Sequence, residues 1–191
     1  MDSEFQLKKV SFWLQQAKDL MLAADQCWHS RTEVLKRIEE GIQPGFNNEL
    51  LEMELNEEAD LNWLYNILTG LAVYYLAVAL LLSRDPERIF DAHSERYIVD
   101  LVEAGGINLL PIQRTFLIRV SDAMGLVKKH GAWKLSLSTK ELAQIKQDIA
   151  QDYVVSTNEK LAMDGLLGNL INTTLSALTE DKDATTQTNN E

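Results

Sequence analysis

A run of 23 residues without a charged side chain, from Leu61 to Ser83, is the feature that most constrains the fold of this chain. A helix of this length is long enough to cross a bilayer. Polar side chains interrupt the first half of the run, at Asn62, Asn66 and Thr69, and no second run of this kind follows. A helix that is apolar on every side also suits the centre of a helical bundle. We therefore predict a buried core helix over Leu61–Leu82 and no membrane contact, with a single membrane span as the alternative.

The rest of the chain contains few residues that break helices. There are 9 Gly and 3 Pro in 191 residues, and the stretches between them are rich in Leu, Ala, Glu, Lys and Gln, which favour helices. The sequence therefore predicts an all-α fold, a bundle of four to six helices with a central hydrophobic helix. The length fits one domain, which we place at residues 1–178.

Breakers and capping patterns locate the other predicted helices. An amphipathic helix is expected from Ser3 to about Ala24, with a restart or kink where Ser30 and Glu33 form a capping-box pattern. A short helix over Tyr97–Ala104 should end at the glycine pair that follows it. Pro111 at a first helical position predicts another helix through about Val127.

The final helical region is expected to run from about Ser138 to Leu178. Ser156 and Glu159 form a further capping-box pattern that divides it. Residues 179–191 are polar and acidic, with too few apolar side chains to offset the entropy of ordering. They are predicted to be a disordered tail.

Several classes of site have no support in the sequence. Cys27 is the only cysteine, which excludes an intramolecular disulfide and a Cys-based zinc cluster. The three histidines, His29, His93 and His130, do not stand at the spacing of a helical metal motif. No Gly-rich phosphate loop or nucleophile elbow occurs, so we expect neither a metal nor a cofactor. The first residues lack the pattern of a secretory signal, and a cytoplasmic location is expected.

The charge of the chain is acidic and unevenly distributed. A formal net charge of −11 disfavours general nucleic-acid binding. One stretch carries acids and no base, and its candidates for docking a basic protein partner are Glu49, Glu52, Glu57, Glu58 and Asp60, with Glu54 between them. The segment from Arg96 to Lys134 contains six bases and three acids. The alternative interpretation of both segments is a set of solvated helix faces.

Arg88 and His93 stand five residues apart and could meet in one turn of chain. An arginine can hold a phosphate through two hydrogen bonds, and a histidine can carry a proton near neutral pH. Together they would suit metal-independent RNA cleavage by the neighbouring 2′-hydroxyl. The alternative is a surface arginine beside a helix cap.

The order of motifs from about Trp63 to Trp133 resembles a known superfamily. The stretches are GLAVYYLAVALLLSRDPERIFDAH, YIVDLVEAGGINLLP and RTFLIRVSDAM. They are similar to the HEPN superfamily of helical-bundle proteins, whose members often show an apolar LAxxxYxxAxxLLL helix, a loop, a histidine and a short helix ending near LLxxAGI. The resemblance places a HEPN-like core at about residues 48–135.

The resemblance implies a bundle that forms a homodimer, and many members are ribonucleases of toxin–antitoxin, CRISPR or antiphage systems. Their motif is an arginine, four to six residues, then a histidine, which Arg88 and His93 match as catalytic candidates. Arg96, Arg114 and Arg119 are then candidates for RNA contact. The chain is thus expected to be a HEPN-like protein of a conflict or toxin–antitoxin system, and a metal-independent endoribonuclease if active. The alternative is a non-catalytic interaction or dimerisation protein that docks a protein partner.

Overall fold

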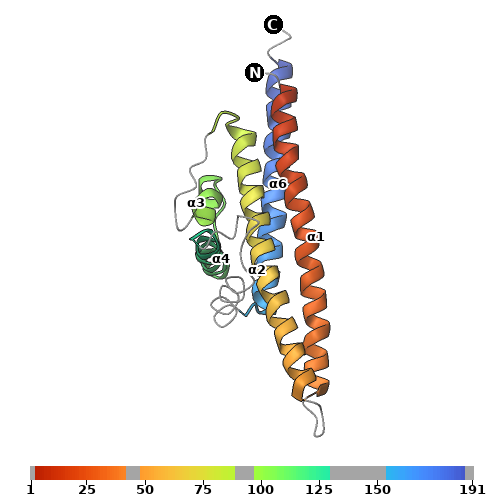
Figure 1. Cartoon of the computed structure of the whole chain (residues 1–191). Helices are drawn as coiled ribbons and strands as arrows, with labels where there is room; N and C mark the ends of the chain where they lie inside the picture. The colour runs from red at the N-terminus through yellow and green to blue at the C-terminus, as the bar shows by residue number, and fades with distance from the viewer. Residues whose placement is uncertain (1–2, 42–47, 89–96, 130–153, 188–191) are drawn as a thin grey trace.

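The computed structural model describes residues 3–41, 48–88, 97–129 and 154–187. Within these ranges the chain forms α-helices and no strand: α1 (Ser3–Gly41), α2 (Asn48–Arg84), α3 (Tyr97–Ala104), α4 (Pro111–Lys129) and α6 (Thr157–Gln187). The predicted all-α bundle with a central hydrophobic helix is confirmed. Figure 1 shows that α1, α2 and α6 lie along one long axis, while α3 and α4 pack on one side of α2.

Helix α1 is continuous because its buried positions keep one heptad spacing along its length. Every seventh residue over this span is buried: Val10, Ala17, Ala24, Arg31 and Ile38. A seven-residue repeat keeps one side of a helix against its partner over many turns, and here the partner is the antiparallel α2 (Figure 1). The predicted restart at Ser30 and Glu33 is therefore wrong, because packing against α2 outweighs a local capping pattern on an exposed side of the helix.

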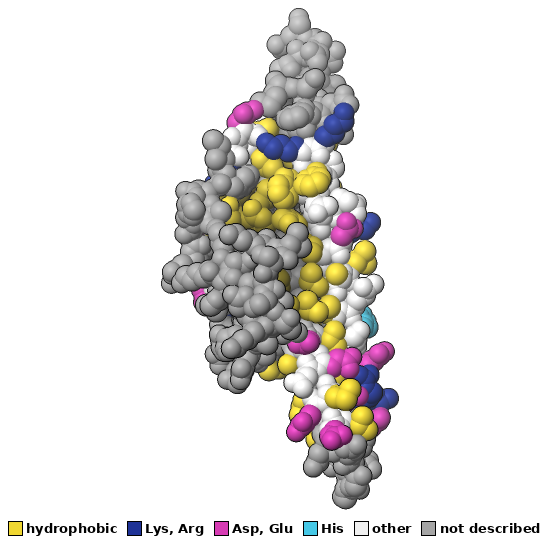
Figure 2. Space-filling view, viewed as in Figure 1, with side chains coloured by type: hydrophobic (Ala, Val, Ile, Leu, Met, Phe, Trp, Pro, Cys, Tyr) yellow, Lys and Arg dark blue, Asp and Glu magenta, His cyan; other side chains and the backbone are white. Residues whose placement is uncertain are grey.

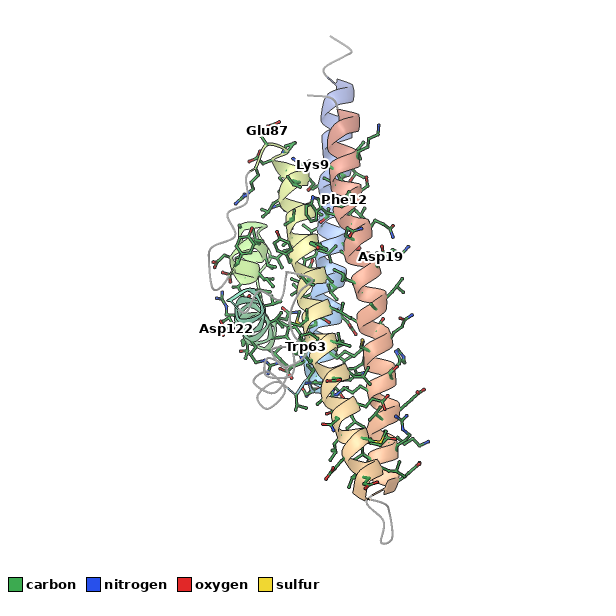
Figure 3. All side chains as sticks on the ribbon, in the orientation of Figure 1. Lys9, Phe12, Asp19, Trp63, Glu87 and Asp122 are labelled. Carbon is green, nitrogen blue, oxygen red and sulfur yellow. The ribbon has the colours of Figure 1, made fainter. Side chains whose placement is uncertain are left out.

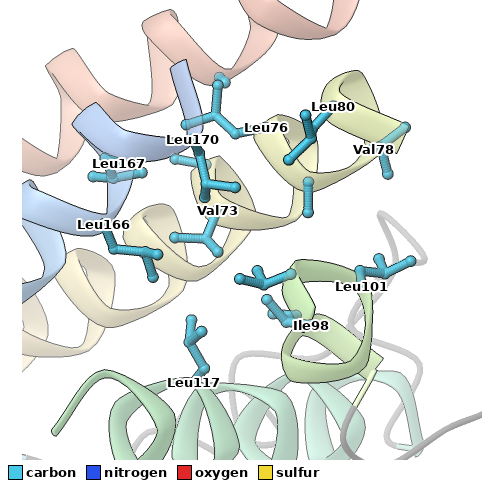
Figure 4. Packing of buried hydrophobic residues seen from close by; sticks show 14 of the residues in the cluster. Val73, Leu76, Val78, Leu80, Ile98, Leu101, Leu117, Leu166, Leu167 and Leu170 are labelled. Carbon is cyan, nitrogen blue, oxygen red and sulfur yellow. The ribbon is translucent and has the colours of Figure 1, made fainter. Parts of the chain in front are cut away.

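Helix α2 is the centre of the bundle, and each of the other described helices contacts it. All residues from 76 to 83 are buried, although successive side chains of a helix point in different directions. Figure 4 shows Val73 and Leu76 of α2 near Leu166, Leu167 and Leu170 of α6. By length and composition α2 is also apolar enough to cross a membrane, but 72% of its most apolar 18-residue segment is buried within the bundle. The predicted core helix is confirmed.

Gly70 allows α2 and α4 to approach each other closely. A Cβ atom added at Gly70 would overlap Cγ1 of Val120 on α4 and would lie 3.2 Å from the Cβ of the same valine. Both residues are buried, so the valine has little room to move away. The absence of a side chain at Gly70 therefore sets the distance between the two helices.

We expect Gly70→Ala to lower the free energy of unfolding by about 1–3 kcal/mol, because the added methyl group overpacks the contact with Val120. The higher helix propensity of alanine, about 1 kcal/mol, offsets part of this cost. Thermal unfolding of Gly70→Ala, Val120→Ala and the double variant checks the prediction. The loss in free energy of unfolding of the double variant should be smaller than the sum of the losses of the two single variants. Simple additivity of the losses would contradict the prediction.

A side-chain hydrogen bond from α2 joins its end to the end of α3. Helix α2 ends at Arg84, shortly before Pro86 and two residues beyond the predicted end of the core helix at Leu82. The guanidinium of Arg84 donates a hydrogen bond of 2.9 Å to the carbonyl of Gly105, directly after α3. Gly106 has a φ of 74°, a backbone conformation that favours glycine. Helix α3 has the predicted bounds, Tyr97–Ala104.

Helix α6 begins at the predicted capping box. The backbone N–H of Ser156 donates to Oε2 of Glu159 over 2.9 Å, and the N–H of Glu159 donates to Oγ of Ser156 over 3.2 Å. The helix ends at Gln187 rather than near Leu178, so helical backbone extends into the range 179–191 predicted to be a disordered tail. Once a helix has formed, each further residue adds a hydrogen bond, so residues with moderate propensity can extend it.

Candidate functional site

The structure describes only one residue of the predicted catalytic pair. Arg88 is exposed just beyond the end of α2, and its backbone N–H donates a 3.2 Å hydrogen bond to the carbonyl of Asp85. His93 and Arg96 lie outside the described residues, so the meeting of Arg88 and His93 stays a prediction. The described part of the pair is an arginine on the surface at the end of the central helix.

The other two arginines predicted to contact RNA both form ion pairs within the bundle. Arg114 pairs with Glu103, between α4 and the end of α3. Arg119 pairs with Glu159 of α6 over 2.5 Å and lies over the ring of Phe116, 5.7 Å from its centroid. The structure therefore gives both side chains a role in holding α4 to its neighbours, which sequence spacing alone did not indicate.

The acidic stretch predicted to dock a partner lies on the first turns of α2, opposite bases of α1. Arg37 pairs with Glu54 over 2.8 Å and with Glu57 over 3.1 Å. The hydrogen bond to Glu54 raises the pKa of the Arg37 guanidinium above its usual value. Part of the acidic stretch therefore joins α1 to α2. We call these two antiparallel helices the hairpin.

Glu58 belongs to a buried polar cluster rather than to the surface. Nε of Arg31 donates a 2.6 Å hydrogen bond to Glu58, and the two side chains are only 6% and 16% exposed. The same arginine donates through Nη1 to the carbonyl of Val155 over 2.8 Å, while the N–H of Val155 donates to Oδ1 of Asn62 over 3.0 Å. We call Arg31, Glu58, Asn62 and Val155 the polar clamp. It attaches the residues before α6 to both helices of the hairpin.

The remaining three acids of this stretch lie beside exposed apolar side chains. Glu49 and Glu52 are exposed, and Asp60 is half-buried. Large apolar side chains between and beside them are also exposed: Leu50 (49%), Met53 (66%) and Leu55 (50%). This mixture of carboxylates and apolar side chains is the least protected apolar surface on α2.

The end of the hairpin as a whole is strongly acidic. Residues 31–60 carry three bases and nine acids, a net charge of −6 out of −11 for the chain. We call this part the acidic hairpin end. Figure 1 shows that the adjoining ends of α1 and α2 project beyond the start of α6, and Figure 2 shows acidic side chains gathered there with hydrophobic ones between them.

The exposed apolar residues of this site were missed by reasoning from sequence. A signal was present, because Leu50, Met53 and Leu55 differ in their direction around the helix and cannot all face α1. The bases of α1 that pair with the acids were missed for another reason. Their partners are 17 to 27 residues away, across the turn of the hairpin.

Within the described residues no group of three or more His, Cys, Asp or Glu side chains is arranged to hold a metal ion. Comparison of the chain with protein-family models, with curated proteins and with solved structures finds no significant match. The function must therefore be inferred from the residues themselves.

Proposed function

We propose that this chain is a non-catalytic helical interaction protein that docks a basic protein partner on the acidic hairpin end. The observation that carries the proposal is the combination of exposed carboxylates with exposed Leu50, Met53 and Leu55 on a projecting hairpin. Apolar side chains supply the contact area of a protein interface, and surrounding charges select a partner of the opposite sign. A net charge of −6 in residues 31–60 repels phosphate backbones, so this surface favours a protein over a nucleic acid.

Charge reversal of the acidic hairpin end is expected to abolish partner capture. The variant Glu52→Lys/Glu57→Lys changes two exposed acids, and the control Glu87→Lys/Asp122→Lys changes two exposed acids away from that end (Figure 3). A basic protein captured by the wild type and by the control should be lost from the first variant. Its capture should weaken as salt rises, because exposed charges are screened over about 8 Å at physiological ionic strength. Equal capture by both variants would rule out this surface.

The alternative proposal is a HEPN-like, metal-independent endoribonuclease of a conflict or toxin–antitoxin system. The observation that favours it is the exposed Arg88 at the end of the apolar central helix, five residues before His93. The RNA cleft would lie between the two copies of a homodimer and would include Arg96. Light scattering that finds only monomer at micromolar concentration would count against this arrangement.

If the chain cleaves RNA, His93→Ala should abolish cleavage and Arg88→Lys should remove most of it, because lysine lacks the planar fork that grips two phosphate oxygens. Cleavage should persist in EDTA. His29→Ala is the matched control, since His29 is an exposed histidine on α1 far from this segment in sequence. Absence of cleavage by the wild type would leave the interaction protein as the function. Equal cleavage by all variants would show that Arg88 and His93 are not the catalytic pair.

A further inference from the structure

The face of the hairpin that α6 covers continues beyond the start of α6. On α2, positions seven residues apart run Leu76, Thr69, Asn62 and Leu55. The first three are 1%, 1% and 2% exposed, whereas Leu55 is 50% exposed. The N–H of Val155, just before α6, donates to Asn62, so the covered part ends near Asn62. Leu55 is the next position of the same face.

Helix α1 shows the same change from covered to uncovered. Its matching positions are Leu14, Met21, Trp28 and Leu35, again seven residues apart. The first three are half-buried against the core. Trp28 lies under the ammonium of Lys160 in the first turn of α6, with 5.9 Å between the nitrogen and the ring centroid. Leu35, the next position, is 37% exposed.

The charges beside these two leucines are negative. Glu39 of α1 follows Leu35 by one turn, Glu52 of α2 precedes Leu55 by one turn, and both are exposed. We call Leu35, Leu55, Glu39 and Glu52 the open hairpin face. It has an apolar centre on two antiparallel helices and a carboxylate on each side. The polar clamp closes it at the end where α6 begins.

We infer that the open hairpin face binds a basic amphipathic helix, which packs against α1 and α2 in line with α6. Helix α6 packs on α2, and the side chain of Lys160 in its first turn reaches α1, where it lies over Trp28 and pairs with Asp25 over 3.2 Å. The two helices of the hairpin therefore already hold a third helix along the covered part of this face. A groove recognises an amphipathic helix by contacts with the apolar residues at positions i, i+3, i+4 and i+7 of that helix. The carboxylates of Glu39 and Glu52 select lysine and arginine on the flanks of that helix. This inference rests on the proposed function, because it names the partner class of the acidic hairpin end.

The test uses the full chain and a synthetic peptide of about 18 residues, long enough to form a helix when bound. The peptide carries leucines at heptad spacing and lysine or arginine on both flanks, and a matched peptide carries glutamate on the flanks. Fluorescence anisotropy should show saturable binding of the basic peptide alone, and circular dichroism should show that its helicity rises in the complex.

Two leucine variants then locate the binding site. Leu55→Ser and Leu175→Ser remove side chains of nearly equal exposure, 50% and 48%. Leu175 lies on α6, outside the acidic hairpin end, so only Leu55 belongs to the open hairpin face. Leu55→Ser should weaken peptide binding about tenfold, the loss typical of an interface anchor. Leu175→Ser should leave binding unchanged, and thermal unfolding should show that both variants fold.

Other outcomes overturn the inference in distinguishable ways. If the basic peptide binds and Glu52→Lys/Glu57→Lys weakens it, but Leu55→Ser does not, the partner uses another face and only the inference fails. If the wild type binds neither peptide and charge reversal has no effect on partner capture, the inference and the proposed function both fail. If the wild type is a dimer that Leu55→Ser converts to monomer, a second copy of the chain occupies the face instead.

Discussion

Arg31→Ala is expected to lower the free energy of unfolding by about 3–5 kcal/mol. The loss leaves the Glu58 carboxylate without its cation although that side chain is only 16% exposed. It also removes the donor to the carbonyl of Val155. A buried charge or carbonyl that loses its partner pays the cost of desolvation without compensation. Urea denaturation followed by circular dichroism measures the change.

The control for Arg31 is Arg37, which pairs with acids of the same hairpin one or two turns nearer its end. Its side chain is 45% exposed, so water can solvate the partners Glu54 and Glu57 when it is removed. Arg37→Ala should therefore shift the denaturation midpoint much less than Arg31→Ala. Equal effects of the two variants would mean that the polar clamp is not what attaches α6.

A double variant separates the pair from the charge it leaves behind. Arg31→Met/Glu58→Met removes both ionised groups from the clamp, and such replacements of a buried pair by apolar side chains are often close to neutral. The double variant should regain part of the stability lost in Arg31→Ala. A remaining deficit is expected from the unbonded carbonyl of Val155, about 1–3 kcal/mol.

Glu159→Ala is expected to lower the free energy of unfolding by about 2–3 kcal/mol. Glu159 closes the capping box with Ser156 and also pairs with Arg119 of α4. Glu159→Gln keeps an acceptor that suits a capping box but loses the ion pair, so its cost should be smaller. Thermal unfolding of the two variants thus separates the cap from the contact between α4 and α6. The matched control is Glu40→Gln, because Glu40 faces Lys36 at 4.0 Å and both side chains are exposed.

The effect of Glu159 should depend on pH. Burial by itself raises the pKa of this carboxyl, but hydrogen bonds from Ser156 and the charge of Arg119 outweigh it, and the pKa lies below the usual 4.5. A lowered pKa in the folded state adds stability above the unfolded pKa, and this stability is lost as pH falls through the folded pKa. The difference between wild type and Glu159→Gln should therefore be constant near neutral pH and shrink below about pH 4.5. A difference that grows as the solution becomes acidic would contradict the assignment.

Local patterns were enough to predict several parts of this fold. The glycine pair after Ala104 and the capping box of Ser156 act within a few residues, and the charge-free run of Leu61–Ser83 is contiguous in sequence. The consequences of all three can therefore be deduced without knowing which helices pack together. A helix that lacks polar faces must be surrounded, which predicts α2 as the centre of a bundle whatever the order of the helices around it. The bounds of α3 follow from its breakers alone.

The tertiary structure decided which polar residues hold the bundle and which remain on its surface. The acids from Glu49 to Asp60 look alike in sequence, yet Glu58 is held by Arg31 in a buried pair while Glu52 is exposed. The difference arises because α1 and α6 approach one side of α2 and leave another open, which no spacing within α2 records. Leu55 and Leu76 stand on the same face by their spacing, and only the point where α6 begins makes one a surface residue and the other part of the core.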